Sequence, residues 1–355
     1  MNVVPDVSAE YPPATYPKSD NSLRAYTTLR LGGPAGTLSV VSETDEAVAT
    51  IRNASVAGEL ALVLAGGSNV VISDAGFPGH VVLLRTLGVR VIRRDDGDVV
   101  VRVAAGEPWD AFVAGAVANG WSGVECLSGI PGSAGATPIQ NVGAYGQEVA
   151  QTIVAVHAYD RRAGEVRVLT PAECGFGYRT SVFKHNDRWL VLEVDFRLGV
   201  RPDSAPIRYA ELARQLGVQV GDRVPLDRAR DTVLKLRAGK GMVLDPDDRD
   251  TWSVGSFFTN PVLAELPDPQ MPHWPGPDGT VKIPAAWLIE RAGFHKGFTI
   301  GGDVAISSKH TLALTNRGAG TTEGLLELAR VIKTGVHDRF GIALHPEPVL
   351  INCAI

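Results

Sequence analysis

The most distinctive segment of the chain is SGIPGSAGATPIQNVGAYG, which runs from Ser128 to Gly146. It holds five glycines, two prolines and three alanines, and it carries no charge. Glycine loses backbone entropy and proline lacks an N–H donor, so a regular helix or strand is disfavoured here. Glycine does let backbone N–H groups approach a ligand closely. A wandering surface loop would usually carry solvated charge, so we expect a ligand-lining loop instead.

The composition is typical of a globular protein with two or three domains. The chain has 355 residues, of which 45% are hydrophobic, enough to bury a sizeable core. A net charge of −5 argues against nucleic acid or an anionic membrane as the main partner. The start of the chain lacks the pattern of a signal peptide, and no apolar run is long enough to span a membrane. We therefore expect a cytoplasmic protein without membrane insertion.

The three cysteines are an odd number, are widely spaced and form no C-x-x-C pair: Cys126, Cys174 and Cys353. This usage is typical of reduced, buried side chains in the cytosol. The eight histidines are scattered and H-E-x-x-H is absent, so we expect no metal site. G-x-G-x-x-G, the P-loop and G-x-S-x-G are absent too, which removes the usual signals of a Rossmann dinucleotide site, an NTPase and a hydrolase.

Hydrophobic spacing predicts an α+β fold. The expected helices are 45–57, 108–120, 226–237, 285–292 and 322–340. The expected strands are 60–64, 70–73, 80–84, 99–106, 153–159, 165–169, 189–196 and 348–351. The first helix is predicted to be capped by Thr44, and the last to bury a stripe of Leu325, Leu328, Ile332 and Val336. Residues 1–21 are expected to form a loose arm, and 261–281 a surface loop.

A second glycine loop, AGGSN at 65–69, lies between two predicted strands. Backbone N–H groups in such a turn suit an anion. Glycine and asparagine equally favour an ordinary hairpin turn, and both interpretations stay open from these residues alone.

Four further segments combine polar side chains with turn residues: GYRTSVFK (177–184), IRYAEL (207–212), SVGSFFTNP (253–261) and LHPEPVLI (344–351). In the third, two aromatics could anchor the segment in a core while Gly255 gives access to the Ser256 hydroxyl. In the fourth, two prolines would hold the Glu347 carboxylate rigidly. The alternatives are surface salt bridges, a plain buried turn and a solvated glutamate.

These motifs, in this order, resemble the UDP-N-acetylenolpyruvoylglucosamine reductases, flavoenzymes of bacterial peptidoglycan precursor synthesis. The resemblance extends from about Leu23 to Ile351 and includes TTLRLGGPA at 27–35. RYAEL is similar to the tyrosine-bearing loop of the longer subtype.

The resemblance implies a two-domain FAD-binding module of the vanillyl-alcohol-oxidase (PCMH) type and a C-terminal α+β substrate-binding domain. After the arm at 1–21, we expect the first FAD-binding subdomain at 22–87. The second would comprise 88–239 with 345–355, and the substrate-binding domain 240–344.

The resemblance also implies non-covalent FAD, held between AGGSN and the 128–146 stretch, with NADPH as the hydride donor. The implied cofactor-binding residues are Gly66, Gly67, Ser68, Asn69, Gly129, Ile130, Pro131, Gly132, Ala134, Gly135 and Gly143. The partners would be NADPH and a UDP-sugar, and we expect a monomer.

The implied reaction reduces an enolpyruvyl ether to a lactyl ether, with hydride from flavin N5. Ser256 would deliver the proton, and Arg179 and Glu347 would stabilise the enediolate that forms on the substrate carboxylate. The substrate-binding residues would be Tyr178, Tyr209, Lys240 and Asn260, the last three at the UDP diphosphate.

Two alternatives compete with this hypothesis. One is a sugar or alcohol oxidase of the same fold. Many such enzymes attach FAD through a histidine near the glycine turn, whereas the nearest histidine here is His80. The other is a sugar-nucleotide-binding protein that has lost its flavin.

Overall fold

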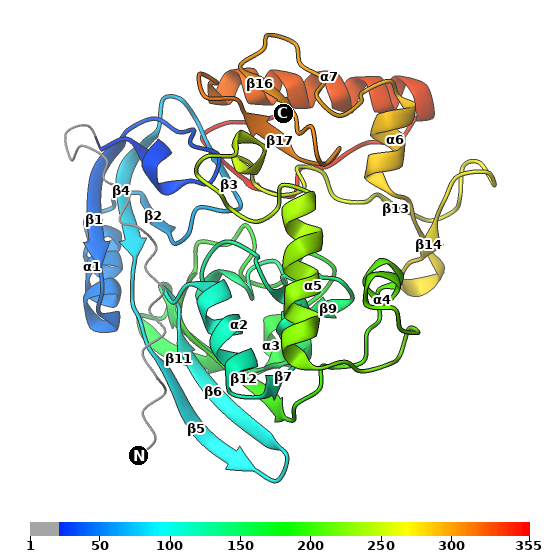
Figure 1. The fold of residues 1–355 in the computed structure, drawn as a ribbon. Helices are drawn as coiled ribbons and strands as arrows, with labels where there is room; N and C mark the ends of the chain where they lie inside the picture. The colour runs from blue at the N-terminus through cyan, green and yellow to red at the C-terminus, as the bar shows by residue number, and fades with distance from the viewer. Residues whose placement is uncertain (1–20) are drawn as a thin grey trace. The chain divides into compact units, whose positions relative to one another are not determined.

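The computed structural model describes residues 21–355 (Figure 1). The chain divides into two compact units, each with its own core. Unit 1 comprises residue 21, 35–66 and 78–239, and unit 2 comprises 22–34, 67–77 and 240–355. Helices and strands are mixed in both units, which confirms the α+β class. All but the last residue of the predicted arm at 1–21 lies outside the described residues.

A small sheet opens unit 1, in the order β1-β4-β2. Its strands are β1 (Ala35–Val41), β2 (Ala61–Leu64) and β4 (Phe77–Leu84), and β2 runs parallel to β4. Helix α1 (Thr44–Val56) confirms the helix predicted at 45–57. The predicted cap is wrong, because Thr44 already lies inside the helix. The N-cap residue is Glu43, whose side chain makes no capping hydrogen bond.

A larger antiparallel sheet forms the centre of unit 1, in the order β11-β10-β12-β6-β5, and β7 also pairs with β12. Its strands are β5 (Val89–Asp95), β6 (Asp98–Ala104), β7 (Trp121–Ser122), β10 (Ile153–Asp160), β11 (Glu165–Leu169) and β12 (Trp189–Val200). Val99, Val101 and Val103 of β6 are fully buried, and Val100 and Ala104 are buried as well.

Helix α2 (Trp109–Ala118) packs on this sheet through aromatic rings. The rings of Trp109 and Phe112 lie 5.6 and 5.2 Å from the ring of Phe196 on β12. The other helices of the unit are α3 (Pro171–Cys174), α4 (Ala210–Leu216) and α5 (Leu226–Gly239). Between α2 and β10 the chain makes only short elements: η2 (Glu125–Leu127), η3 (Ala134–Ala136), β8 (Gly143–Ala144), β9 (Gln147–Glu148) and η4 (Val149–Gln151). The glycine-rich stretch therefore contains little regular structure, as predicted.

Unit 2 is built on α7 (Thr322–Phe340), whose predicted stripe of Leu325, Leu328, Ile332 and Val336 is fully buried. Its other elements are η1 (Leu23–Tyr26), β3 (Val70–Ile72), η5 (Arg249–Thr251), α6 (Ala285–Arg291), β16 (Val304–Ile306), β17 (Leu314–Asn316) and β18 (Val349–Ile351). Strand β18 runs parallel to β3, and β16 is antiparallel to β17.

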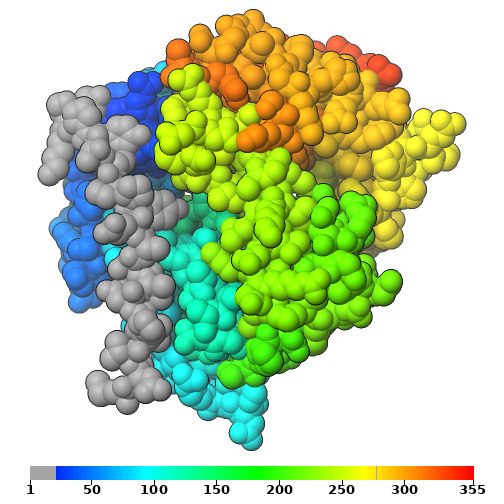
Figure 2. All heavy atoms as spheres, in the orientation of Figure 1, coloured from blue at the N-terminus to red at the C-terminus, as the bar shows by residue number. Residues whose placement is uncertain are grey.

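The excursion at 261–281 is more regular than predicted. It contributes to a three-stranded sheet of β13 (Val262–Leu263), β15 (Val281–Lys282) and β14 (Trp274–Pro275), with η6 (Pro277–Gly279) in the β14–β15 connection. The expected surface location is right: the Trp274 side chain is half exposed, and in Figure 2 the yellow atoms of this region stand at the surface.

The C-terminal segment 345–355 packs with unit 2, since β18 pairs with β3 and Cys353 Sγ donates to the carbonyl of Val71. The sequence assigned this segment to the second FAD-binding subdomain. The three-domain division itself stays a prediction.

Candidate functional site

The two predicted glycine loops meet within unit 1. A Cβ on Gly66 would lie 2.5 Å from the Cα of Gly132, so the two backbones approach at a distance that requires glycine at position 66. Arg85 Nη1 donates to the carbonyl of Ala65 at 2.9 Å and fixes the start of the first loop. The hairpin alternative for residues 65–69 is excluded, because β2 pairs with β4 while β3 pairs with β18. We call this backbone contact between Gly66 and Gly132 the glycine seam.

An ion pair fixes the beginning of the 128–146 stretch. The N–H of Gly129 donates to Asp110 Oδ1 at 2.6 Å, and Arg230 binds both oxygens of that carboxylate at 2.7 and 2.9 Å. Burial alone would raise the pKa of Asp110, but the hydrogen bonds from Arg230 and Gly129 outweigh it and hold the pKa below its usual value. The Gly129 amide is thus committed to Asp110.

The middle of the stretch is held by main-chain bonds. The N–H groups of Ala134 and Gly135 donate to the carbonyls of Glu107 and Ala105, each at 2.9 Å. A Cβ on Gly135 would lie 2.3 Å from that of Ala105, so close packing requires this glycine. Ligand contacts at Ala134 and Gly135 would therefore use atoms other than their amides. Ile130 is partly buried against the core of unit 1.

Ser133 lies in the same stretch and was not predicted to be a site residue. Its side chain is buried, and among residues 21–355 its Oγ has no hydrogen-bond partner. It follows Gly132, whose carbonyl accepts from the N–H of Trp109 at 3.0 Å. No pattern distinguishes this serine from an ordinary loop hydroxyl, so the sequence alone could not have identified it.

The side chain of Arg179 binds the backbone near the end of the 128–146 stretch. Its Nη2 donates to the carbonyl of Gly143 at 2.6 Å and its Nη1 to that of Asn141 at 3.3 Å. The backbone of Arg179 has a φ of +54°, and its own carbonyl accepts from Lys184 Nζ at 3.1 Å. The guanidinium also lies 5.4 Å from the ring centre of Tyr178. The structure thus joins two motifs that are far apart in the sequence.

Tyr209 lies at the N-cap position of α4, with its side chain 43% exposed. Its ring meets that of Tyr145 edge to face, with centres 5.5 Å apart. Burial raises the pKa of Tyr145 to about 12, so this phenol stays a hydrogen-bond donor at neutral pH. Tyr145 belongs to the quoted stretch but was not singled out as a site residue.

In unit 2 the second half of AGGSN leads into β3. Gly67 has a φ of +58°, and a Cβ there would lie 1.9 Å from the carbonyl oxygen of Tyr26. The carbonyl of Gly67 accepts from the N–H of Thr28, and that of Asn69 accepts from Val349. Ser68, between them, also makes an interaction. The glycine turn is therefore next to the strand that follows Glu347.

Ser256 and Glu347 lie on neighbouring segments of unit 2. The N–H of Glu347 donates to the carbonyl of Phe257 at 2.9 Å, one residue beyond Ser256. Phe257 and Phe258 are buried, which confirms the predicted aromatic anchor. Gly255 has a φ of +74°, a conformation that favours glycine, directly before the serine.

Asn260 and Lys240 both belong to unit 2. Asn260 Oδ1 accepts from the N–H of Ala285 at 2.9 Å and so satisfies the start of α6. An anion at Asn260 would therefore meet its amide nitrogen. Lys240 directly follows α5 and also interacts with another residue.

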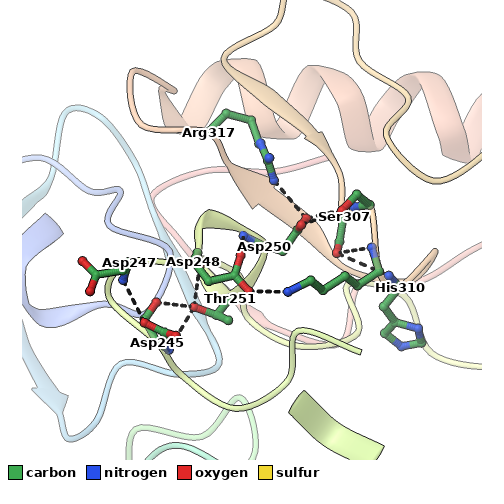
Figure 3. Close-up of polar contacts among 10 residues, drawn as sticks. Asp245, Asp247, Asp248, Asp250, Thr251, Ser307, His310 and Arg317 are labelled. Carbon is green, nitrogen blue, oxygen red and sulfur yellow. Dashed lines mark hydrogen bonds and ion pairs between the residues drawn. The ribbon is translucent and has the colours of Figure 1, made fainter. Parts of the chain in front are cut away.

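A polar cluster braces the segment that leads to Ser256 (Figure 3). Asp250 accepts from the N–H and Oγ of Ser308 at 2.9 and 2.6 Å and from Arg317 at 2.9 Å. Burial alone would raise the pKa of Asp250, but these bonds and one from Ser307 lower it. Nearby, Lys309 pairs with Asp248 at 2.5 Å. The cluster ties η5 to the β16–β17 connection.

Within residues 21–355, no group of three or more acidic, histidine or cysteine side chains could hold a metal ion. No helix in the same part of the chain combines the length and the apolar content that crossing a membrane requires.

Comparisons with known proteins cover both units. The family "UDP-N-acetylenolpyruvoylglucosamine reductase, C-terminal domain" matches residues 245–351, and the family "FAD binding domain" matches 37–170. The UDP-N-acetylenolpyruvoylglucosamine reductase of Salinispora arenicola is 59% identical, with 100% of both chains covered. That of Thermobifida fusca is 55% identical over 94% of this chain and 97% of the relative. The solved structure of UDP-N-acetylenolpyruvylglucosamine reductase from Thermus caldophilus is 28% identical, with a TM-score of 0.65 and coverage of 93% and 97%.

Proposed function

The chain belongs to the UDP-N-acetylenolpyruvoylglucosamine reductase family, and we propose a role in its reaction for residues of both units. The protein is an FAD-containing oxidoreductase that reduces UDP-N-acetylglucosamine enolpyruvate with NADPH for peptidoglycan synthesis. Identity along the full chain to these reductases favours this activity over an oxidase of the same fold or a flavin-free binding protein. The fold is the FAD-binding module with the family's C-terminal domain.

The glycine seam of unit 1 fits a cofactor held by backbone. Gly66 and Gly132 approach so closely that a side chain at position 66 is excluded, and the buried hydroxyl of Ser133, the next residue after Gly132, has no hydrogen-bond partner among residues 21–355. We propose that FAD binds along this seam and along Gly67, Ser68 and Asn69. When bound, FAD supplies the hydride transfer between NADPH and substrate. The remaining cofactor-binding residues that the motif implies are Gly129, Ile130, Pro131, Ala134, Gly135 and Gly143.

Arg179 would stabilise the charge that develops on the substrate carboxylate during reduction. A guanidinium has five donors in a fixed plane, and two are used on the carbonyls of Gly143 and Asn141. These bonds orient the group before substrate arrives, as electrostatic catalysis requires. Glu347 would assist only in its protonated form, because a carboxylate has no donor to offer.

Ser256 would deliver the proton to the second alkene carbon. Buried Phe257 and Phe258 fix the segment, and the main-chain bond from Glu347 to Phe257 brings the proposed donor and stabiliser onto adjacent segments. This bond is the single observation that carries the catalytic assignment. A serine is a weak acid, so it must protonate a strongly basic intermediate.

The substrate diphosphate would be held by Tyr209, Lys240 and Asn260, with Tyr178 orienting the enolpyruvyl group. Tyr209 offers a half-exposed phenol, and Lys240 offers a positive charge. Asn260 would use its amide nitrogen, because its oxygen already accepts from Ala285.

We also propose a cytoplasmic monomer without nucleic-acid partners, in keeping with the negative net charge. The division into FAD-binding subdomains at 22–87 and 88–239 and a substrate domain from 240 belongs to the same proposal. Sedimentation at working concentration tests the monomer, and a dimer would contradict it.

The catalytic assignment is tested by separating the two half-reactions in the Ser256→Ala variant. We expect NADPH to bleach its flavin at the wild-type rate, whereas the reduced protein should return to yellow at least about 100-fold more slowly with substrate. Ser253→Ala is the matched control, because Ser253 precedes the same turn and donates no proton in this scheme. Near-normal reoxidation of Ser256→Ala would end the assignment.

A further inference from the structure

The hydroxyl of Ser133 is an exception among the buried polar groups of unit 1. Ser133 is 4% exposed, and its Oγ has no hydrogen-bond partner within residues 21–355. A serine hydroxyl offers one donor and two acceptor positions. Burying it unpaired costs free energy, so each such group in a folded protein requires an explanation.

The backbone position makes the missing bond more unusual. Ser133 is the N-cap residue of η3, where a serine side chain commonly accepts from a backbone N–H in the first turn. Here the N–H of Ala136 donates to the backbone carbonyl of Ser133 at 3.0 Å, and the side chain makes no capping bond. The Ser133 side chain therefore does not make the capping hydrogen bond to a backbone N–H that its position would allow.

Neighbouring hydroxyls in the same stretch are satisfied. Ser128 Oγ donates to the carbonyl of Glu125 at 2.6 Å, and Thr137 Oγ1 donates to that of Ala134 at 2.7 Å. Loose packing of the whole stretch would leave all three unpaired. Among these three hydroxyls, only that of Ser133 has no partner within residues 21–355.

Ser133 directly follows the glycine that meets Gly66. A Cβ on Gly66 would lie 2.5 Å from the Cα of Gly132, so this seam leaves no room for a side chain at position 66. We propose that the Ser133 hydroxyl is reserved for FAD and hydrogen-bonds one of its polar oxygen or nitrogen atoms directly. This inference rests on the FAD-binding seam proposed above and adds a side chain to a site otherwise made of backbone.

The inference predicts opposite effects on stability and affinity. In the FAD-free protein, Ser133→Ala removes an unpaired buried hydroxyl, so its melting temperature should equal or exceed that of the wild type. The same variant should bind FAD about 5–10-fold more weakly, because the cofactor loses one hydrogen bond. Ser133→Cys, with a weak donor, should lie between the two.

The matched control is Ser181→Ala. Ser181 is also buried in unit 1, but its Oγ donates to the carbonyl of Ile139 at 2.6 Å and accepts from the N–H of Phe183 at 3.1 Å. This variant should melt at a lower temperature without FAD and should keep FAD affinity within about twofold.

The experiment removes FAD from each purified full-length variant, records thermal unfolding, and titrates FAD while following flavin fluorescence. Wild-type affinity in Ser133→Ala, combined with weakened binding in Gly66→Ala, would overturn the role of Ser133 and leave the seam intact. Wild-type affinity in both variants would overturn the seam as well. A loss of FAD-free stability in Ser133→Ala as large as that in Ser181→Ala would show that the hydroxyl has a protein partner, and it would also overturn the inference.

Discussion

Replacing Gly66 by alanine tests whether the seam between the two glycine loops is the FAD-binding element. The new Cβ would lie 2.5 Å from the Cα of Gly132 and 3.0 Å from its carbonyl carbon. Both are backbone atoms, which cannot rotate away as a side chain would. The φ of Gly66 is not in the positive range, so alanine adds steric overlap without backbone strain.

The size of the effect follows from the overlap. Carbon atoms in contact normally lie about 3.5–4 Å apart, so the loops must separate by about 1 Å. Overpacking of this kind costs about 1–3 kcal/mol of folding stability. If the shift breaks one charge-assisted bond from a backbone N–H to the cofactor, the loss of about 1.5–3 kcal/mol weakens FAD binding by about 10–150-fold.

The assay is titration of the FAD-free variant with FAD, with the protein concentration held below the Kd. Gly301→Ala is the matched control, since a Cβ there meets nothing within 4 Å and its φ is also not positive. It should bind FAD like the wild type. A Kd for Gly66→Ala within twofold of the wild type would refute the steric argument.

Three further predictions concern the catalytic cation, the polar cluster and the core of unit 2. In Arg179→Lys, the lysine cannot bind the carbonyls of Asn141 and Gly143 in one plane, so turnover should fall by at least about 10-fold while FAD affinity stays unchanged. Steady-state kinetics and FAD titration measure the two quantities, and unchanged turnover would contradict the catalytic role of Arg179. Asp250→Asn should lower the free energy of unfolding at pH 7 by about 2–3 kcal/mol in denaturant titrations, because it weakens the bonds from Ser308 and Arg317. The pKa of Asp250 is lower in the folded than in the unfolded state. Its ionised carboxylate therefore stabilises the fold above the unfolded pKa of about 3.9, and this stabilisation is lost as the pH falls through the folded pKa. The Asp250→Asn variant should accordingly lose less stability on acidification than the wild type. Leu328→Ala should destabilise unit 2 by about 2–5 kcal/mol, and a cost below 1 kcal/mol would mean that α7 is not packed as described.

Long periodic segments were predictable from the sequence, whereas short ones were not. Helix α7 was predictable because apolar residues recur at helical spacing from Leu325 to Val336, over about three turns. Strands β16 and β17 have three residues each, too few to show a period of two. Strand β5 was missed because most of its side chains are exposed and three of them are arginines, which hide the alternation. The excursion at 261–281 was rich in turn residues, and its two-residue strands depend on pairing across the sheet.

In the candidate site, too, local motifs were predictable from the sequence and contacts between distant residues were not. The glycine loops, Ser256 and Glu347 were recognisable as local motifs. The approach of Gly66 to Gly132, by contrast, joins residues 66 positions apart and depends on the packing of the whole unit. The unpaired state of Ser133 is defined by what its neighbours bind, which no local pattern records.

One anaerobic experiment on the purified holoprotein tests whether the reduced flavin passes its hydride to UDP-N-acetylglucosamine enolpyruvate. NADPH is added until the flavin absorption is bleached, and UDP-N-acetylglucosamine enolpyruvate is then added in the absence of oxygen. We expect the yellow band to return within the turnover time of the enzyme, with formation of UDP-N-acetylmuramate. Flavin that stays bleached with this substrate and is reoxidised only by oxygen would contradict the claim.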